Sequence, residues 1–207
     1  ALALGSLVTE GTPVRLAGED SRRGTFSQRH AALVDYENER VWIPITTLPG
    51  RTAPFWVYDS LLSEYAALGF EYGYAHENPS ALVMWEAQFG DFVNGAQIII
   101  DQYLVAAEDK WGQQNGLVLL LPHGFEGQGP EHSSGRIERF LSLCARNNIR
   151  VAYPTSSAQY FHLLRSQVRR DRKIPLTVFT PKSMLRAVPT KSPLADLVSG
   201  SFQEVLD

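Results

Sequence analysis

The residues Leu117-Val-Leu-Leu-Leu-Pro-His-Gly-Phe-Glu-Gly-Gln-Gly-Pro-Glu-His-Ser-Ser134 begin as an apolar run and continue directly into a loop with two histidines, two glutamates and three glycines. A short apolar run bounded by turn residues predicts a buried strand. In open α/β sheets, ligands bind in the loops that follow the carboxyl ends of the strands, and this loop carries little that packing would require. We therefore expect the functional site at this loop.

Four other short apolar runs are bordered by Gly, Pro or polar residues in the same way. The predicted strands are residues 14–17, 81–85, 117–121, 150–153 and 176–180. Amphipathic stretches separate the runs and predict helices near residues 60–74, 91–107, 135–146 and 157–168. This alternation predicts an α/β fold, with a mainly parallel, twisted sheet covered by helices on both faces.

Two segments depart from the alternation. Residues 18–57 are rich in Arg, Gly and turn residues and are too long for an ordinary connection, and segments of this length are usually functional. From Pro181 onward, prolines and polar residues replace the strand and helix patterns. We therefore predict one domain over residues 1–187 and a linker over residues 188–207 that leads toward a further domain.

The composition limits the class of partner. The chain has 207 residues, of which 44% are hydrophobic and 20% are charged, and its net charge is −3. This is enough apolar material for one sizeable core. Nucleic acids and anionic membranes require clustered positive charge, and the only dense basic run, residues 169–173, is more typical of a solvated connection. The longest aliphatic run, residues 117–121, is far too short to cross a bilayer. We expect no nucleic-acid partner and no membrane partner.

The cysteine count and the first residue indicate where the chain works and how it was produced. Cys144 is the only cysteine, which predicts no intrachain disulfide and a reducing compartment. The sequence starts with Ala and not Met, and it shows no signal peptide. These features favour a fragment or a processed product.

The loop at residues 122–134 allows three interpretations. Its histidines, with Glu126 and Glu131, are of the type that bind zinc, but their spacing matches no standard zinc site. Its glycines are of the type that surround phosphate, but the chain has neither Gly-x-x-x-x-Gly-Lys-Ser/Thr nor Gly-x-Gly-x-x-Gly. In the third interpretation, His132 simply adjoins the start of the next helix. A histidine at that place is still available for proton transfer, because imidazole titrates near neutral pH.

Glu64 lies in a predicted helix at helical spacing from Leu61 and Leu68. The three residues would share the apolar stripe that a surface helix buries. A carboxylate on that stripe loses its solvation, so it would be retained only with a partner that shares a proton with it. The alternative is that the helix is rotated about its axis relative to this expectation, so that Glu64 faces solvent.

Residues 85–97 also lead from a strand end into a helix. Phe89 and Phe92, beside Gly90, could present a flat surface to a planar ring, although aromatic residues at such a turn are more often part of the core. Asp91 is suited to cap the helix that follows. This segment is therefore a second candidate for ligand contact.

Residues 18–30 form a further cluster at the start of the long segment after the first strand. The cluster contains Arg22, Arg23, Arg29 and His30. These side chains are candidates to contact an anionic substrate or a partner subunit. The alternative is that they are ordinary surface charges.

The clusters also carry a family resemblance. The stretches are Glu19-Asp-Ser-Arg-Arg-Gly-Thr-Phe-Ser-Gln-Arg-His30, Leu62-Ser-Glu-Tyr-Ala-Ala-Leu-Gly-Phe-Glu-Tyr-Gly-Tyr74, Trp85-Glu-Ala-Gln-Phe-Gly-Asp-Phe-Val-Asn-Gly-Ala-Gln97, Pro122-His-Gly-Phe-Glu-Gly-Gln-Gly-Pro-Glu-His-Ser-Ser134 and Thr180-Pro-Lys-Ser-Met-Leu-Arg186. In this order and at these spacings, the chain resembles the pyrimidine-binding domain of the E1 component of 2-oxoglutarate dehydrogenase, over residues 1–187. The details are most similar to the actinobacterial forms, in which the E1 module is part of a larger multifunctional 2-oxoglutarate decarboxylase and dehydrogenase.

The resemblance implies a transketolase-like fold and thiamine-diphosphate chemistry, in which the cofactor is the electron sink. It implies an enzyme of the tricarboxylic acid cycle that decarboxylates 2-oxoglutarate and passes the succinyl unit to a lipoyl group on the E2 component. Glu64 matches the family's glutamate that hydrogen-bonds N1′ of the aminopyrimidine. Phe89 and Phe92 fall where the family stacks and walls the pyrimidine ring, with Gln88 beside them. His132 and His123 match histidines that contact the substrate and intermediates.

The resemblance also implies that this chain holds half of a site. In the family, the diphosphate and Mg²⁺ are bound by a separate domain with a Gly-Asp-Gly…Asn-Asn motif, which these residues lack, so no metal ligand is predicted here. The family's active site lies between two subunits, which implies a homodimer formed through this domain. We expect Arg22 to contact substrate in the complete enzyme and the isolated chain to be inactive. The expected location is the cytoplasm of a bacterium, or the mitochondrial matrix of a eukaryote.

A second class of function is a non-catalytic dimerisation or regulatory module with the same fold. Packing between subunits requires neither a carboxylate at position 64 nor a histidine at position 132. The presence of Glu64 together with His132 therefore favours the catalytic interpretation.

Overall fold

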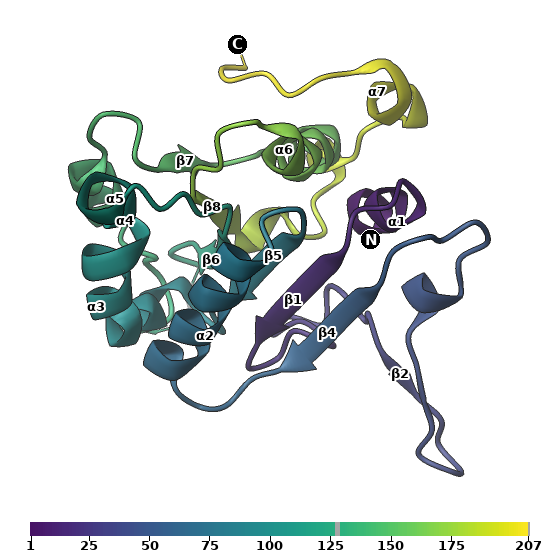
Figure 1. Cartoon of the computed structure of the whole chain (residues 1–207). Coiled ribbons are helices and arrows are strands. Elements are labelled where there is room, and N and C mark those ends of the chain that lie inside the picture. Colours follow the sequence, from purple (N-terminus) through teal and green to yellow (C-terminus); the bar gives the residue numbers. More distant parts are fainter. Residues whose placement is uncertain (127–128, 207) are drawn as a thin grey trace.

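The computed structural model describes residues 1–126 and 129–206 and contains a six-stranded sheet with the order β4-β1-β5-β6-β8-β7 (Figure 1). Every pair of neighbouring strands in this sheet is parallel. The strands are β1 (Val14–Gly18), β4 (Phe55–Asp59), β5 (Leu82–Glu86), β6 (Val118–His123), β7 (Arg150–Ala152) and β8 (Leu176–Pro181). The predicted parallel α/β fold is confirmed, and the five predicted strands are present.

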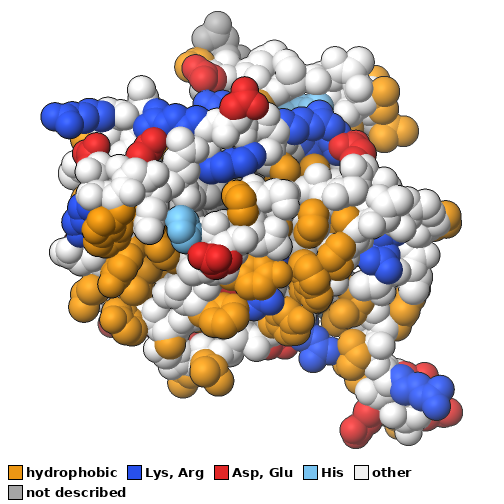
Figure 2. Space-filling model, in the orientation of Figure 1, with side chains coloured by type: hydrophobic (Ala, Val, Ile, Leu, Met, Phe, Trp, Pro, Cys, Tyr) orange, Lys and Arg blue, Asp and Glu red, His pale blue; other side chains and the backbone are white. Residues whose placement is uncertain are grey.

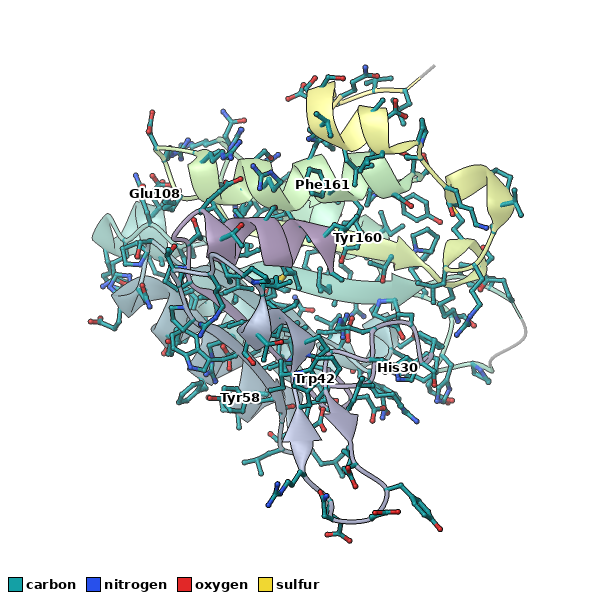
Figure 3. The ribbon with its side chains drawn as sticks, turned by 90° about the vertical axis from the view of Figure 1, so that its right-hand side faces the viewer. His30, Trp42, Tyr58, Glu108, Tyr160 and Phe161 are labelled. Carbon is teal, nitrogen blue, oxygen red and sulfur yellow. The ribbon has the colours of Figure 1, made fainter. Side chains whose placement is uncertain are left out.

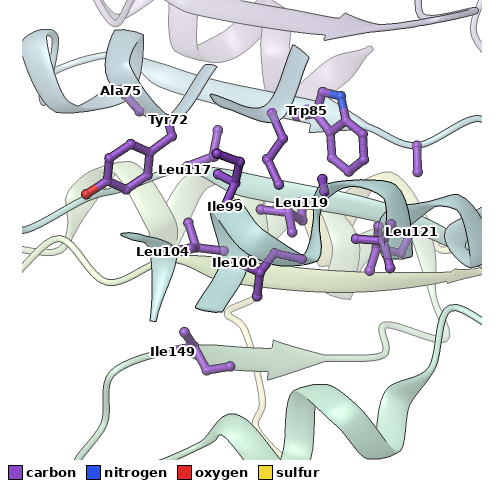
Figure 4. Close-up of a cluster of buried hydrophobic side chains, with 14 of the residues drawn as sticks. Tyr72, Ala75, Trp85, Ile99, Ile100, Leu104, Leu117, Leu119, Leu121 and Ile149 are labelled. Carbon is purple, nitrogen blue, oxygen red and sulfur yellow. The ribbon is translucent and has the colours of Figure 1, made fainter. Parts of the chain in front are cut away.

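The apolar run of β6 is explained by burial on both faces of the sheet. Leu117, Leu119 and Leu121 belong to one core cluster, which Figure 4 shows, whereas Val118 and Leu120 belong to the other. Successive side chains of a strand point to opposite faces, so a central parallel strand needs apolar residues at every position. The run predicts a central strand for this reason.

Helices cover the two faces of the sheet (Figure 1). On one face lie α2 (Glu64–Glu77), α3 (Gln97–Ile99), α4 (Ala107–Trp111) and α5 (Ile137–Leu143), with the 3₁₀ helix η2 (Gly90–Ala96) and the π-helical turn η3 (Ile100–Leu104). On the other lie α1 (Leu2–Thr9) and α6 (Ser157–Arg169), and α7 (Leu194–Ser199) packs on α6. The predicted continuous helix over residues 91–107 is wrong, because 3₁₀, α and π turns follow one another there. Gly90 and Gly95, which are poor helix formers, lie in η2, where this segment begins.

The interpretation of residues 18–57 as one long connection is also wrong. The segment ends inside a strand of the main sheet, β4, which lies at the edge of the sheet next to β1. It also forms an antiparallel hairpin, β2 (Leu33–Val34) with β3 (Val41–Trp42), followed by the 3₁₀ helix η1 (Pro44–Thr47). The hairpin projects from the body of the molecule (Figure 3), and its tip carries charged side chains (Figure 2).

The residues after β8 form the short 3₁₀ helices η4 (Lys182–Met184) and η5 (Val188–Thr190), and from Thr190 onward hydrogen bonds hold the chain along α6. The Ser157 hydroxyl donates to the Thr190 carbonyl at 2.9 Å, and the Gln159 side chain donates to the Ser201 carbonyl at 3.1 Å. The domain boundary near residue 187 stays a prediction. Within the described part of the chain, no helix is long and apolar enough to cross a membrane.

Candidate functional site

The carboxyl ends of the parallel strands meet at one edge of the sheet. The chain leaves β1 toward β4 and leaves β5 toward β6, on opposite sides. The space between the carboxyl ends of these two strands is therefore a topological switch point, where open α/β sheets bind ligands. Glu19 directly follows β1, and Gln88 closely follows β5.

Glu64 and Glu19 line one narrow cavity at this switch point, together with Trp85, Ala87 and Gln88. Burial, followed by the charge of Glu64 and hydrogen bonding with it, raises the pKa of Glu19 above its ordinary value. A neighbouring negative charge disfavours the ionised form of a carboxyl group. The cavity is therefore lined by two interacting carboxyl groups and not by a single one.

The local structure corrects the predicted helical stripe. Helix α2 begins only at Glu64, and Ser63 caps it by accepting the N–H of Ala66 at 3.2 Å. Leu68 is fully buried as predicted, but Leu61 precedes the helix and is 78% exposed. Glu64 is half-buried at the first turn of the helix, because its neighbour is the switch-point cavity and not the apolar core.

Buried polar contacts fix the loop after β1 against the end of β5. Arg29 donates to both carboxylate oxygens of Glu86, and its side chain is 16% exposed while that of Glu86 is 6% exposed. The side-chain amide of Gln88 donates to Asp20 at 2.9 Å. Arg29 is therefore used within the protein, which removes it as a substrate contact and shows that the loop is held in place.

The other predicted arginines have different surroundings. Arg23 lies 3.5 Å from Asp20 and is exposed. The backbone N–H of Arg22 donates to Asp59 at 2.9 Å, and its side chain has no ion pair within residues 1–126 and 129–206. Arg22 therefore has a charge that the fold does not use.

An aromatic wall surrounds the ring of Phe89. The His132 ring packs edge-on against Phe89 with a centroid distance of 4.4 Å and against Phe92 at 5.5 Å. Phe26, from the loop after β1, packs edge-on against Phe89 at 5.3 Å. Phe89, Phe92 and His132 are each half-buried, so they line the surface of the carboxyl edge and are not part of the core. The structure therefore brings three of the predicted site residues together.

His123 lies at the end of β6, and a hydrogen bond from the backbone determines which tautomer its ring adopts. Its Nδ1 accepts the N–H of Gly135 at 3.0 Å, which places the ring proton of the neutral form on Nε2. Burial lowers the pKa of His123, against the opposing charges of Asp91 and Glu126. Its ring neighbours are Phe125, Tyr153 and Phe179, and no ring contact with His132 occurs in the described residues.

Asp91 does not cap a helix as predicted. Its side chain is buried and instead accepts the N–H of Ser134 at 3.0 Å, which ties the loop after β6 to η2. The interpretation of His132 as adjoining the start of the next helix is also wrong, because α5 begins only at Ile137, after Arg136 in a left-handed conformation with no side-chain cap. The Asp91 carboxylate, which could have capped its own helix, is therefore used in a contact between two loops.

Sequence reasoning missed two charged residues of this edge. Glu19 lies two residues beyond the end of a predicted strand, so its position was a usable signal. Lys182 lies just beyond the last predicted strand, yet its side chain is only 6% exposed, and it donates to the His132 carbonyl. Across residues 1–126 and 129–206, no group of three or more His, Cys, Asp or Glu side chains is arranged to hold a metal ion. Residues 127–128 of the loop lie outside the described residues.

Comparisons with known proteins agree with this fold. Residues 1–188 match the family model described as transketolase, pyrimidine binding domain. The chain is 56% identical over 209 residues to the 2-oxoglutarate dehydrogenase E1 component of Cupriavidus necator, with coverage of 99% of this chain and 22% of that protein. It is 55% identical over 206 residues to the 2-oxoglutarate dehydrogenase E1 component of Brucella ovis, with coverage of 99% and 20%.

The chain thus spans about a fifth of the length of these curated relatives. The finer likeness to actinobacterial multifunctional forms stays a prediction. The parallel sheet, the clustered side chains at its carboxyl edge and the match over residues 1–188 show that the chain belongs to the transketolase pyrimidine-binding domain family.

Proposed function

We propose that this chain is the pyrimidine-binding half of a thiamine-diphosphate-dependent 2-oxoglutarate dehydrogenase E1 or 2-oxoglutarate decarboxylase. The observation that carries the proposal is the pairing of Glu64 with Glu19 at the switch point, next to the wall of Phe89, Phe92 and His132. The relatives named as 2-oxoglutarate dehydrogenase E1 components support the choice of substrate.

The residues present fit the pyrimidine end of thiamine diphosphate. An aminopyrimidine is a planar ring with a basic nitrogen, so it needs an apolar wall and a partner for that nitrogen. The half-buried Phe89 and Phe92 offer the wall, and Glu64 offers the partner. When bound, thiamine diphosphate supplies the electron sink for decarboxylation of a 2-oxo acid. Mg²⁺ and the diphosphate would be held by another part of the complete protein.

Glu64 would share a proton with N1′ of the pyrimidine. Glu19, whose own pKa is raised, lines the same cavity as Glu64, and the Glu64 carboxyl would form the hydrogen bond with the ring nitrogen. Removal of water strengthens this hydrogen bond, because the local dielectric constant falls. Gln88, whose side chain is hydrogen-bonded to Asp20, would lie beside the same end of the pyrimidine ring.

The histidines and Arg22 would act on the substrate side. His132 faces the aromatic wall and would exchange protons with the reacting group, whereas the Nε2 proton of His123 would donate a hydrogen bond. The free charge of Arg22 suits a carboxylate of 2-oxoglutarate. Transfer of a succinyl unit to lipoyl-E2, a homodimer through this domain and a cytoplasmic or mitochondrial-matrix location complete the proposal.

The test is Glu64→Gln in the full-length protein loaded with thiamine diphosphate and Mg²⁺. The amide keeps the shape of the side chain but cannot share its proton, so hydrogen–deuterium exchange at C2 of the bound cofactor should fall by about 10² or more, the scale of a positioned proton-transfer group. Glu77→Gln is the matched control, because Glu77 ends the same helix with its side chain 84% exposed. Exchange at the wild-type rate in the Glu64 variant, with normal cofactor occupancy, would refute the assignment.

A further inference from the structure

Lys182 is a buried lysine at the carboxyl edge of the sheet. It follows β8 directly, and its side chain is 6% exposed. Lysine is rarely buried, because its ammonium group loses hydration unless protein groups replace the water. The groups around the ammonium must therefore compensate its charge. Those groups show which part of the chain Lys182 fixes in place.

The three groups around the Lys182 ammonium belong to two other loops. The backbone carbonyl of His132 accepts a hydrogen bond from Nζ. Nζ lies 5.5 Å from the centroid of the Phe89 ring, a cation–π distance. The third group is the carboxylate of Glu126, with an oxygen 3.8 Å from Nζ.

Glu126 is itself fixed by the segment that carries Lys182. The N–H of Ser183 donates to Glu126 at 3.1 Å. This hydrogen bond and the charge of Lys182 lower the pKa of Glu126, although burial acts in the opposite direction. The end of β8 therefore holds the loop after β6 at two points, Glu126 and His132.

We propose that Lys182 is a positioning residue for His132. Its ammonium group fixes the backbone that carries this histidine, and it lies on the same Phe89 ring against which the imidazole packs at 4.4 Å. One ammonium group thus contacts both the backbone of His132 and the aromatic ring against which its side chain packs. A misplacement of about 1 Å in a reacting group can cost about 10² in rate. The inference rests on the proposed function, since it gives His132 the proton-transfer role described above.

The test is a double-mutant cycle on the full-length protein, with kcat and KM measured for 2-oxoglutarate. The variants are Lys182→Met, Lys182→Arg, His132→Ala and the double variant. Lys182→Met should lower kcat by about tenfold or more with KM within about threefold, because it disturbs His132 and not substrate binding. In the His132→Ala background it should change kcat by less than about twofold, because residues that act as a unit are non-additive.

Three further measurements separate positioning from general stability. Lys182→Arg should recover kcat to within about fivefold of wild type, because a guanidinium can donate to the same carbonyl and lie on the same ring. Hydrogen exchange at the amides of His132, Ser133 and Ser134 should accelerate in Lys182→Met but not in Lys182→Arg. Lys173→Met is the matched control, because the Lys173 ammonium likewise donates to the backbone, to two carbonyls at 2.7 Å each, but lies beyond the other end of β8. It should retain wild-type kcat.

Each contrary outcome has a distinct meaning. A raised KM with unchanged kcat, or an effect of Lys182→Met that persists in the His132→Ala background, would show that Lys182 contacts substrate directly and would overturn the inference. Wild-type kcat in Lys182→Met beside an impaired His132→Ala would overturn the inference and leave the proposed function intact. Wild-type kcat in His132→Ala would remove the proton-transfer role of His132 and the inference with it. If Lys182→Met does not fold, Lys182→Gln takes its place in the cycle, with the same criteria.

Discussion

A single backbone group fixes the chemical state of His123. The N–H of Gly135 occupies Nδ1, so protonation of the ring would cost this hydrogen bond as well as the energy of burying a charge. The lowered pKa means that the folded chain binds a proton at lower pH than the unfolded chain does. The stability that depends on neutral His123 is therefore complete above pH ~6.5, the unfolded value, and is lost as pH falls toward the folded value.

His123→Asn tests this linkage. The Asn side-chain oxygen can accept an N–H but does not titrate, so the wild type should lose more thermal stability than the variant between pH 7.5 and 5, the range being about that of histidine titration. Thermal unfolding followed by circular dichroism across this pH range gives the comparison. Parallel curves for the two proteins would show that His123 does not contribute to the pH dependence.

At the scale of elements, the close approach of two loops makes the site. A Cβ atom on Gly90 would lie 2.6 Å from the Pro122 carbonyl oxygen and 2.8 Å from the Gly135 Cα, both of them backbone atoms. The start of η2 therefore packs directly on the ends of the loop after β6. The hydrogen bond from Ser134 to Asp91 joins the same two elements.

Gly90→Ala should separate these loops. We expect a loss of about 1–3 kcal/mol in the free energy of unfolding, the usual cost of overpacking, measured by urea denaturation. Gly73→Ala is the control, since Gly73 lies in α2 with no atom within 4 Å of its ideal Cβ, and there alanine should be neutral or stabilising. Equal free energies of unfolding for the two variants would mean that the loops can move apart to accommodate the methyl group without loss of stability.

The elements also show where sequence patterns succeed and fail. The β6 run was predictable because burial on two faces leaves only apolar residues. Strand β4 was missed because it is an edge strand of mixed pattern, with Tyr58 and Asp59 exposed, inside a segment rich in turn residues. The helix predicted over residues 91–107 failed because tertiary contacts of Asp91 and Gly90 replace a regular first turn.

At the scale of the whole molecule, the half-buried Glu64, Phe89 and His132 lie at the carboxyl edge of the sheet, and under the proposed function they would meet only the pyrimidine end of the cofactor. We expect the isolated 207-residue chain to bind thiamine diphosphate weakly and to have no 2-oxoglutarate decarboxylase activity, because the charged diphosphate end would remain in water. Calorimetric titration with cofactor and Mg²⁺ measures the affinity, and the full-length protein under the same conditions is the control. A low-micromolar dissociation constant for the isolated chain would contradict the half-site.

The sequence by itself determined the parallel α/β class, and it predicted which loops would carry the chemistry and which residues, Glu64, Phe89 and His132, are candidates for it, because such predictions follow from local periodicity and from motifs within single segments. Only the tertiary structure decided which distant groups act together. Glu19 meets Glu64, Arg29 meets Glu86, and Lys182 meets His132 across 45, 57 and 50 positions of sequence. Those pairs depend on the order β4-β1-β5-β6-β8-β7, which places the carboxyl ends of distant strands side by side. No local pattern encodes that order, because it is set by how all the strands and helices bury their apolar faces together.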